Sequence, residues 1–124
     1  MKLLLDTHAA LWWLTGDERL GETTADRLTD ESNQVFLSAA VVWEVAIKRS
    51  LGKLETPEDF APTLLGAGAQ ALPISLDHAA AVEQLPWHHR DPFDRILVAQ
   101  AAIEGAALVS HDAALQPYGV RLVW

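Results

Sequence analysis

Five acidic residues of this 124-residue chain occupy positions where a carboxylate can do chemistry. Most of them follow short apolar runs or begin helical stretches, and one lies inside a helical stretch. In open α/β sheets, ligands bind beyond the carboxyl ends of the strands, so such acids can converge on one edge of a sheet. The five residues are Asp6, Glu44, Asp91, Asp94 and Asp112.

Carboxylate oxygens are the ligands that hard divalent cations prefer, and Mg²⁺ is commonly held by a few carboxylates together with water. Three or four converging acids would hold one or two Mg²⁺ or Mn²⁺ ions, which activate water and neutralise the charge of a scissile phosphate. A metal-dependent hydrolase of phosphodiester bonds is therefore one interpretation of these residues.

Each acid also has a purely structural interpretation. Asp6, Asp91 and Asp112 occupy plausible helix N-cap positions, and Asp94 follows Asp91 by three residues, as in a shortened capping box. Glu44 could form a surface ion pair with Lys48, four residues later. The residue types alone leave both interpretations open.

Glu44 and Asp94 fit the structural interpretation least well. The helical neighbours of Glu44 are Ala40, Val41 and Ile47, and a carboxylate on such an apolar stripe is normally excluded from an interior. Asp94 falls in the first turn of a predicted helix, where the helix dipole favours its ionised form. Both positions become more understandable if a metal ion or a hydrated pocket lies beside them.

Strands and helices alternate along the predicted chain, which indicates an α/β fold with a mainly parallel sheet. The acids converge if the first, second and fourth strands are neighbours. We expect short strands at Lys2–Leu5, Val35–Leu37, Ala71–Ile74, Ala107–Val109 and Val120–Val123. We expect helices at Ala9–Leu14, Thr23–Ser32, Ala39–Leu51, Pro57–Leu65, from Ser75 or Asp77 to Leu85, at Phe93–Glu104 and as one turn at Asp112–Gln116.

The composition is that of one globular domain covering residues 1–124, with 50% hydrophobic residues and no cysteine. The three leucines after Lys2 are too few for a secretion signal, and no apolar run is long enough to cross a membrane, so we expect a cytoplasmic protein without a membrane partner. A formal net charge of −8 argues against binding nucleic acid by bulk attraction and suits a basic protein partner.

Four stretches of the chain, in this order and at this spacing, resemble the PIN-domain ribonucleases, and specifically the toxins of VapBC toxin–antitoxin pairs, the VapC proteins. The resemblance extends over essentially the whole chain, and its first and third stretches are the most specific. The stretches are Leu3–His8, Leu37–Glu44, His88–Arg95 and Leu108–Asp112.

The resemblance implies a three-layer α/β/α sandwich and a catalytic, metal-binding quartet of Asp6, Glu44, Asp94 and Asp112, with Asp91 as an additional acid. It places Thr7 and Ser110 where the family has hydroxyl residues that hydrogen-bond the acids, although Ser110 stands where threonine is usual. It also implies Mg²⁺- or Mn²⁺-dependent hydrolysis of RNA, and a cognate antitoxin protein that blocks the site.

Several cations flank the predicted site and could hold an RNA backbone, or could simply form a solvated surface. These residues are Lys48, Arg49, Lys53, Arg90 and Arg95. His88 and His89 are expected to be loop residues, because adjacent residues seldom face one site. Trp12, Trp13 and Trp43 lie on apolar helical stretches and are expected in the core or at an interface; the stretch that holds Trp12 and Trp13 suggests a homodimer.

Other functions fit the sequence less well than a metal-dependent nuclease, or differ from it only in biological role. A response-regulator receiver needs paired acids after the first strand and a lysine after the last, and the chain has neither. A catalytically inactive PIN fold used for binding is disfavoured because all four acids are present. An RNA-processing nuclease without a toxin role stays open.

Overall fold

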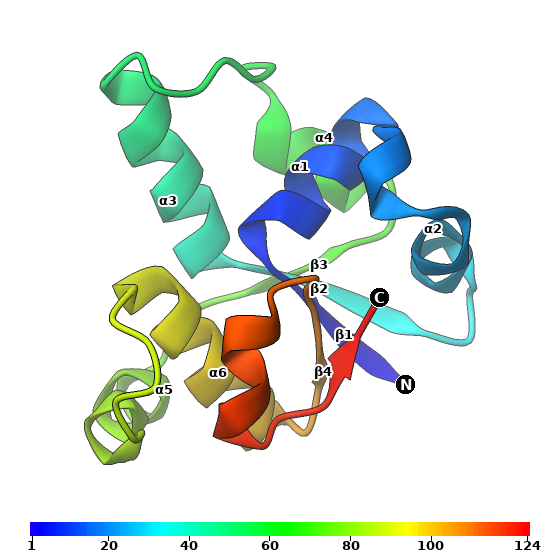
Figure 1. Ribbon diagram of the computed structural model, residues 1–124. Coiled ribbons are helices and arrows are strands. Elements are labelled where there is room, and N and C mark those ends of the chain that lie inside the picture. Colours follow the sequence, from blue (N-terminus) through cyan, green and yellow to red (C-terminus); the bar gives the residue numbers. More distant parts are fainter.

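The computed structural model describes residues 1–124 and shows a parallel five-stranded sheet with helices on both faces (Figure 1). The strand order is β3-β2-β1-β4-β5, and every neighbouring pair is parallel. The predicted α/β/α sandwich is therefore confirmed, and the first, second and fourth strands are neighbours. The strands are β1 (Lys2–Leu5), β2 (Gln34–Ser38), β3 (Gln70–Leu72), β4 (Ala107–Val109) and β5 (Leu122–Val123).

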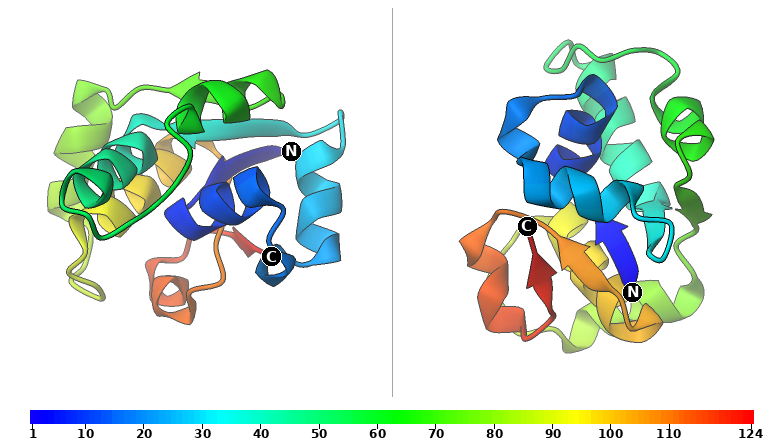
Figure 2. Two further views of the ribbon diagram at one scale, coloured as in Figure 1. Left: turned by 90° about the horizontal axis from the view of Figure 1, so that it is seen from above. Right: turned by 90° about the vertical axis from the view of Figure 1, so that its right-hand side faces the viewer.

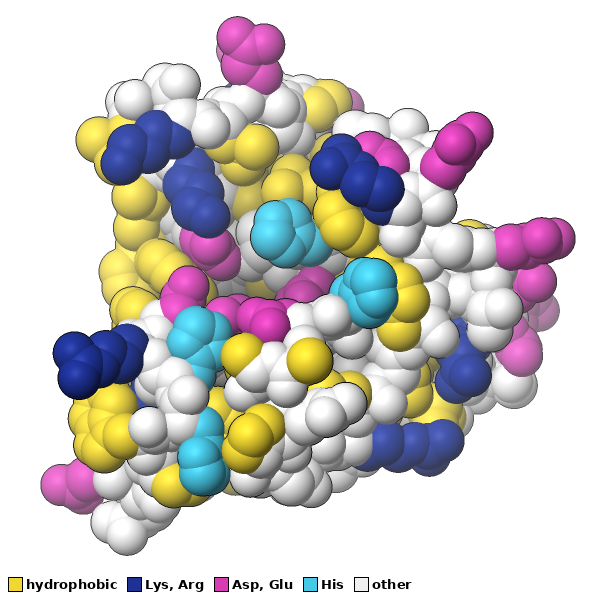
Figure 3. All heavy atoms as spheres, in the orientation of Figure 1, with side chains coloured by type: hydrophobic (Ala, Val, Ile, Leu, Met, Phe, Trp, Pro, Cys, Tyr) yellow, Lys and Arg dark blue, Asp and Glu magenta, His cyan; other side chains and the backbone are white.

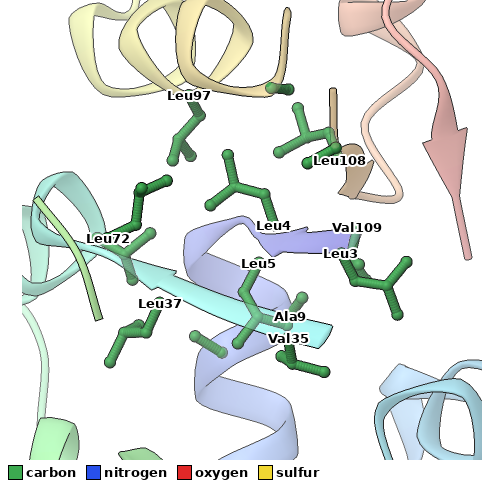
Figure 4. Packing of buried hydrophobic residues seen from close by; sticks show 14 of the residues in the cluster. Leu3, Leu4, Leu5, Ala9, Val35, Leu37, Leu72, Leu97, Leu108 and Val109 are labelled. Atoms are coloured by element: carbon green, nitrogen blue, oxygen red, sulfur yellow. The ribbon is translucent and has the colours of Figure 1, made fainter. Parts of the chain in front are cut away.

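The central strand β1 carries three leucines that are completely buried, Leu3, Leu4 and Leu5. A parallel sheet is covered by helices on both faces, so its central strands are apolar on both sides rather than alternating. Leu3 is in register with Val35 of β2, and Leu5 with Val109 of β4. Figure 4 shows these side chains packed on both sides of the sheet, which makes β1 a rigid base for the residues after it.

Helices α1 and α4 cover one face of the sheet, and α5 and α6 cover the other (Figures 1 and 2). The α-helices are α1 (Thr7–Thr15), α2 (Glu22–Thr29), α3 (Ala39–Ser50), α4 (Phe60–Gly66), α5 (Leu76–Ala81) and α6 (Pro92–Glu104). Short 3₁₀ helices are η1 (Glu18–Leu20), η2 (Val82–Gln84) and η3 (Ala113–Tyr118). None of the helices has the length and apolar character needed to cross a membrane.

Three helices begin where a strand has just ended, each capped by a side chain at that point. Asp6 caps α1, Ser38 caps α3 and Asp112 caps η3, and each accepts a backbone N–H of the first turn. The carboxyl ends of β1, β2 and β4 are neighbours in the sheet, so these helix starts gather at one edge. At the far end of α3, Gly52 adopts a left-handed φ of +69°, as expected for the residue after a helix end.

A buried chain of polar groups fixes the start of α3 against the opposite layer. The Ser38 hydroxyl donates to Gln100 Oε1 on α6 at 2.6 Å, and Gln100 Nε2 donates to the Pro73 carbonyl at 3.3 Å. The same hydroxyl oxygen accepts the Ala40 N–H. This satisfied network holds the first turn of α3 in place.

Several predicted element boundaries differ from the structure, and two of them have a clear local reason. Helix α2 ends at Thr29 rather than Ser32, because Asp30 Oδ1 accepts the N–H and the hydroxyl of Ser32 and forms a turn. Strand β3 ends before Pro73, which has no N–H to continue the ladder. Helix α4 begins at Phe60, three residues later than predicted.

Leu4→Ala is expected to lower the free energy of unfolding by about 2–5 kcal/mol, because Leu4 is completely buried and its truncation leaves a cavity in the core. Leu76→Ala is the matched control: Leu76 is 90% exposed, and its loss should change stability by less than about 0.5 kcal/mol. Urea denaturation of both variants measures the difference. Equal losses would contradict the assignment of β1 as the centre of the core.

Candidate functional site

A cavity of about 600 Å³ lies at the carboxyl edge of the sheet, enclosed by α1, α3 and the start of α6. All five acids named from the sequence line it: Asp6, Glu44, Asp91, Asp94 and Asp112. Figure 3 shows acidic side chains gathered along the floor of a hollow, with histidine and cationic side chains around it. The fold therefore brings together carboxylates that lie up to 106 residues apart in the chain, from Asp6 to Asp112.

Asp6 is the most firmly held of these acids and is only 7% exposed. Its Oδ1 accepts the Ala9 N–H at 2.8 Å, and its own N–H donates to the Val109 carbonyl of the neighbouring strand. Burial raises the pKa of the Asp6 carboxyl, while the Ala9 N–H and the Ser110 hydroxyl oppose the shift. The negative charge of Asp112 adds to the increase, which indicates that these two carboxylates sense one another.

Glu44 is also 7% exposed, and both of its carboxylate oxygens have a partner. Thr7 Oγ1 donates to Oε1 at 2.5 Å, and Lys48 Nζ lies 2.7 Å from Oε2. The hydrogen bond to Glu44 raises the pKa of Lys48, and the charges of Asp91 and Asp94 also contribute. The ion pair between Glu44 and Lys48 that the sequence suggested therefore exists. It lies at the wall of the cavity rather than on an open surface.

Asp94 lies in the first turn of α6, where Asp91 is the N-cap and accepts the N–H groups of Phe93 and Asp94. Asp94 Oδ2 lies 2.8 Å from His89 Nε2, and about a quarter of each of these two side chains is exposed. Burial and then the charge of Asp91 raise the pKa of Asp94 to about 6, against the opposing effect of His89. The charge of Asp6 also contributes to the increase.

Asp112 is the exposed member of the group and caps η3 through Oδ1, which accepts the Ala114 N–H at 2.9 Å. Its own N–H donates to the hydroxyl oxygen of Ser110, which is 3% exposed. The hydroxyl of Ser110 therefore lies between the two strand-end acids, Asp6 and Asp112.

The donor set fits a divalent cation. One ligand atom from each of His89, Asp94 and Asp112 lies within 4.8 Å of the other two. Asp6 and Asp91 add carboxylates to the same cavity. Carboxylate oxygens suit Mg²⁺ or Mn²⁺, and the cysteine ligands that select softer metals are absent from the chain.

His89 was not predicted as a member of the site, although its segment was. Consecutive His88 and His89 point to different places: His88 packs edge-on against Tyr118, and His89 contacts Asp94. Only the folded loop before α6 distinguishes the two, so no pattern in the sequence could have selected His89.

The RNA contact predicted for Arg95 is wrong, because this side chain is buried. Its guanidinium donates to the carbonyls of Pro86, Val82 and Leu85 and to the Tyr118 hydroxyl. It also lies 4.0 Å from the ring centroid of Trp87, which is itself exposed. Arg95 thus holds the loop that carries His89, and its donors are not available to phosphate.

Three cations line the cavity, and two of them, Lys48 and Lys53, are among the RNA-binding candidates predicted from the sequence. Lys48 lines the wall on α3, Lys53 follows that helix, and Arg19 reaches the cavity from η1. Arg19 was missed because its position beside α1 depends on how the chain folds back after Gly16. Arg49 and Arg90 do not line the cavity, and their contact with RNA stays a prediction.

The sequence pattern of the PIN domain family matches residues 3–119, a span that includes all five acids. No curated protein matches the chain by sequence. Several solved structures share the fold over nearly the full length of both chains, at sequence identities too low to show more than the fold.

One such structure is VapBC2 from Rickettsia felis, bound to a DNA fragment from their promoter: TM-score 0.74, 15% identity, covering 99% of this chain and 98% of that chain. VapBC-1 from nontypeable Haemophilus influenzae has a TM-score of 0.69 and 14% identity, covering 99% and 97%. DNA-bound VapBC from Salmonella typhimurium has a TM-score of 0.68 and 17% identity, covering 99% and 97%.

Asp94→Asn is expected to stabilise the metal-free protein at pH 7.5 by about 1–3 kcal/mol and to leave its stability nearly unchanged at pH 4. The folded-state pKa of Asp94 lies above its ordinary value of 3.8, so the folded chain holds this proton more tightly than the unfolded chain. Stability is therefore lost as the pH rises from about 4 to 6 and stays low above that range.

Urea denaturation in EDTA at several pH values measures this effect. Asp59→Asn is the control, because Asp59 is exposed and its side chain accepts no capping hydrogen bond. A stabilisation by Asp94→Asn that is the same at pH 4 and pH 7.5 would show that the charge of Asp94 is not its cause.

Proposed function

The chain belongs to the PIN domain family, and from that premise we propose that it is a Mg²⁺- or Mn²⁺-dependent endoribonuclease, the toxin of a VapBC-type toxin–antitoxin pair. In this proposal residues 1–124 form one nuclease domain that acts in the cytoplasm on RNA. The observation that carries the proposal is the cavity in which five carboxylates and His89 converge.

Asp6 and Asp94 are the proposed principal metal ligands, with Glu44 and Asp112 binding directly or through water and Asp91 and His89 beside them. When bound, the metal supplies Lewis-acid activation of water and neutralises charge on the scissile phosphate. Thr7 holds the Glu44 carboxylate in place through its hydroxyl, and Ser110 positions the strand-end acids. Arg95 keeps the loop of His89 in its observed position.

The hydrolytic step needs a base and no protein nucleophile. A water oxygen forms the new bond to phosphorus, the phosphorus–oxygen bond to one nucleoside breaks, and the leaving oxygen takes up a proton. Asp112 is the proposed acceptor of the proton lost by water, because its carboxylate is exposed and its Oδ2 is not used in capping η3.

Two other functions, an inactive binding module and an RNA-processing nuclease, would require different features of the protein. An inactive PIN-fold binding module needs no complete set of acids, whereas this chain retains all of them. An RNA-processing nuclease needs no antitoxin. A small protein encoded beside the chain's gene that co-purifies with it and stops RNA cleavage supports the toxin role over RNA processing.

RNA cleavage is expected to disappear when divalent metal is removed with EDTA and to return on addition of Mg²⁺ or Mn²⁺. Asp6→Asn and Asp94→Asn should each lower the rate at least about 100-fold, while Asp59→Asn should retain it. A gel assay with single-stranded RNA measures all four proteins. Cleavage that continues unchanged after rigorous metal removal would rule out the metal mechanism.

We also propose that the protein is a homodimer, on the basis of the exposed side chain of Trp43 rather than the tryptophans of α1. Trp12 and Trp13 are half-buried against the core, whereas Trp43 on α3 is 58% exposed. Light scattering should give twice the mass of one chain, and Trp43→Glu should reduce it to that of one chain. Leu76→Glu, at an exposed site elsewhere, is the control; a monomeric wild-type protein would contradict the proposal.

A further inference from the structure

Four aromatic side chains form a connected array that begins in the acidic cavity and continues beside it, and the proposed hydrolysis uses none of them. His8 stacks on Trp12 with ring centroids 5.4 Å apart, and Trp12 meets Trp124 edge-on at 5.7 Å. His111 stacks on the same Trp124 at 5.0 Å with an interplanar angle of 9°. We call His8, Trp12, Trp124 and His111 the aromatic array.

The aromatic array is adjacent to the acids in the fold. His8 and Trp12 line the same cavity as Asp6 and Glu44. His8 lies two residues after Asp6, His111 lies directly before Asp112, and strands β1 and β4, which precede them, are neighbours. Histidine side chains accordingly lie beside the acidic floor in the space-filling view (Figure 3).

The array has a fixed inner part and an exposed outer part. Trp12 and Trp124 are half-buried and pack against the core, whereas His8 and His111 are exposed and rest on them. Arg19 adds to this support, because its guanidinium carbon lies 4.7 Å from the Trp12 ring centroid. The outer histidine rings are therefore held ready for a further planar group, and binding one requires little additional ordering.

The charges of the cavity show why a polyanionic ligand needs such contacts. Five acids line the cavity against three cations, and two of those cations already have carboxylate partners. Lys48 Nζ lies 2.7 Å from Glu44, and Arg19 Nη2 lies 2.7 Å from Asp17. Attraction to phosphate through lysine and arginine is therefore weak here, and contacts to the bases must supply part of the affinity.

We propose that the aromatic array is a base-stacking site for single-stranded RNA, in which the outer faces of His8 and His111 stack against unpaired bases next to the phosphate at the acids. This inference rests on the proposed ribonuclease function and adds the residues that select unpaired over paired RNA. A duplex cannot use the site, because its bases are stacked on one another. Stacking on an aromatic face accepts every base, so the array favours strandedness rather than sequence.

Binding to the full-length Asp94→Asn protein, in which cleavage is blocked, tests the array in the presence of Mg²⁺. The probe is a mixed-sequence 12-nucleotide RNA with 2-aminopurine placed at successive positions, used alone and annealed to its complement. Fluorescence anisotropy measures Kd, and quenching of 2-aminopurine reports stacking. His8→Ala, His111→Ala, His8→Phe and the control His88→Ala are each added to this background.

If the aromatic array stacks on bases, the fluorescence of 2-aminopurine should be quenched at one or two adjacent positions of the single strand. His8→Ala and His111→Ala should each weaken single-strand binding about tenfold and reduce the quenching, with little change for the duplex. His8→Phe should retain both properties, because it keeps a stacking face without the imidazole. His88→Ala should behave as the background, since His88 packs against Tyr118 outside the cavity.

The proposal is overturned if no position is quenched, if His8→Ala binds the single strand as tightly as the background, or if single strand and duplex lose affinity equally. Loss of antitoxin binding by His8→Ala, with RNA binding intact, would assign the array to a protein partner instead. The two proposals fail separately: quenching without any RNA cleavage by the wild type counts against the nuclease function, and cleavage with no role for His8 counts against the array.

Discussion

Mutual repulsion among carboxylates in one partly dehydrated cavity is the constraint on which the rest of the structure depends. Two unit charges 4 Å apart interact with about 4 kcal/mol at an effective dielectric constant of 20. The fold tolerates this cost because the three leucines of β1 are completely buried between two layers and because Lys48, His89 and backbone N–H groups offset part of the charge. Burial is the main cause that raises the pKa values of Asp6 and Asp94, and the charges of neighbouring acids add to both increases.

Capping a helix and binding a metal are compatible roles, because a carboxylate has two oxygens. Asp6, Asp91 and Asp112 each use Oδ1 to accept backbone N–H groups, which fixes the side chain and leaves Oδ2 free of such bonds. One geometry is therefore compatible with both interpretations that the sequence leaves open. Glu44 differs, because both of its oxygens are already engaged, so direct coordination there requires exchange of the Lys48 contact.

Features that depend on local sequence could be predicted, and those that depend on distant contacts could not. The apolar runs predicted the strands because buried parallel strands are continuously hydrophobic. The capping residues likewise predicted where α1, α3 and α6 begin. The burial of Arg95, the orientation of His89 and the approach of Arg19 to the cavity depend on carbonyls and rings elsewhere in the chain, which no local pattern reports.

We propose that the acids at the carboxyl edge of the sheet form a divalent-metal site. The most direct measurement is X-ray diffraction from crystals grown with Mn²⁺. Data are collected at the manganese absorption edge and again at an energy below that edge. We expect an anomalous peak at the absorption edge, within coordinating distance of the Asp6 and Asp94 carboxylates, that is absent in crystals of the Asp94→Asn variant. A wild-type map with no manganese peak in this cavity, at a Mn²⁺ concentration that supports full activity, would contradict it.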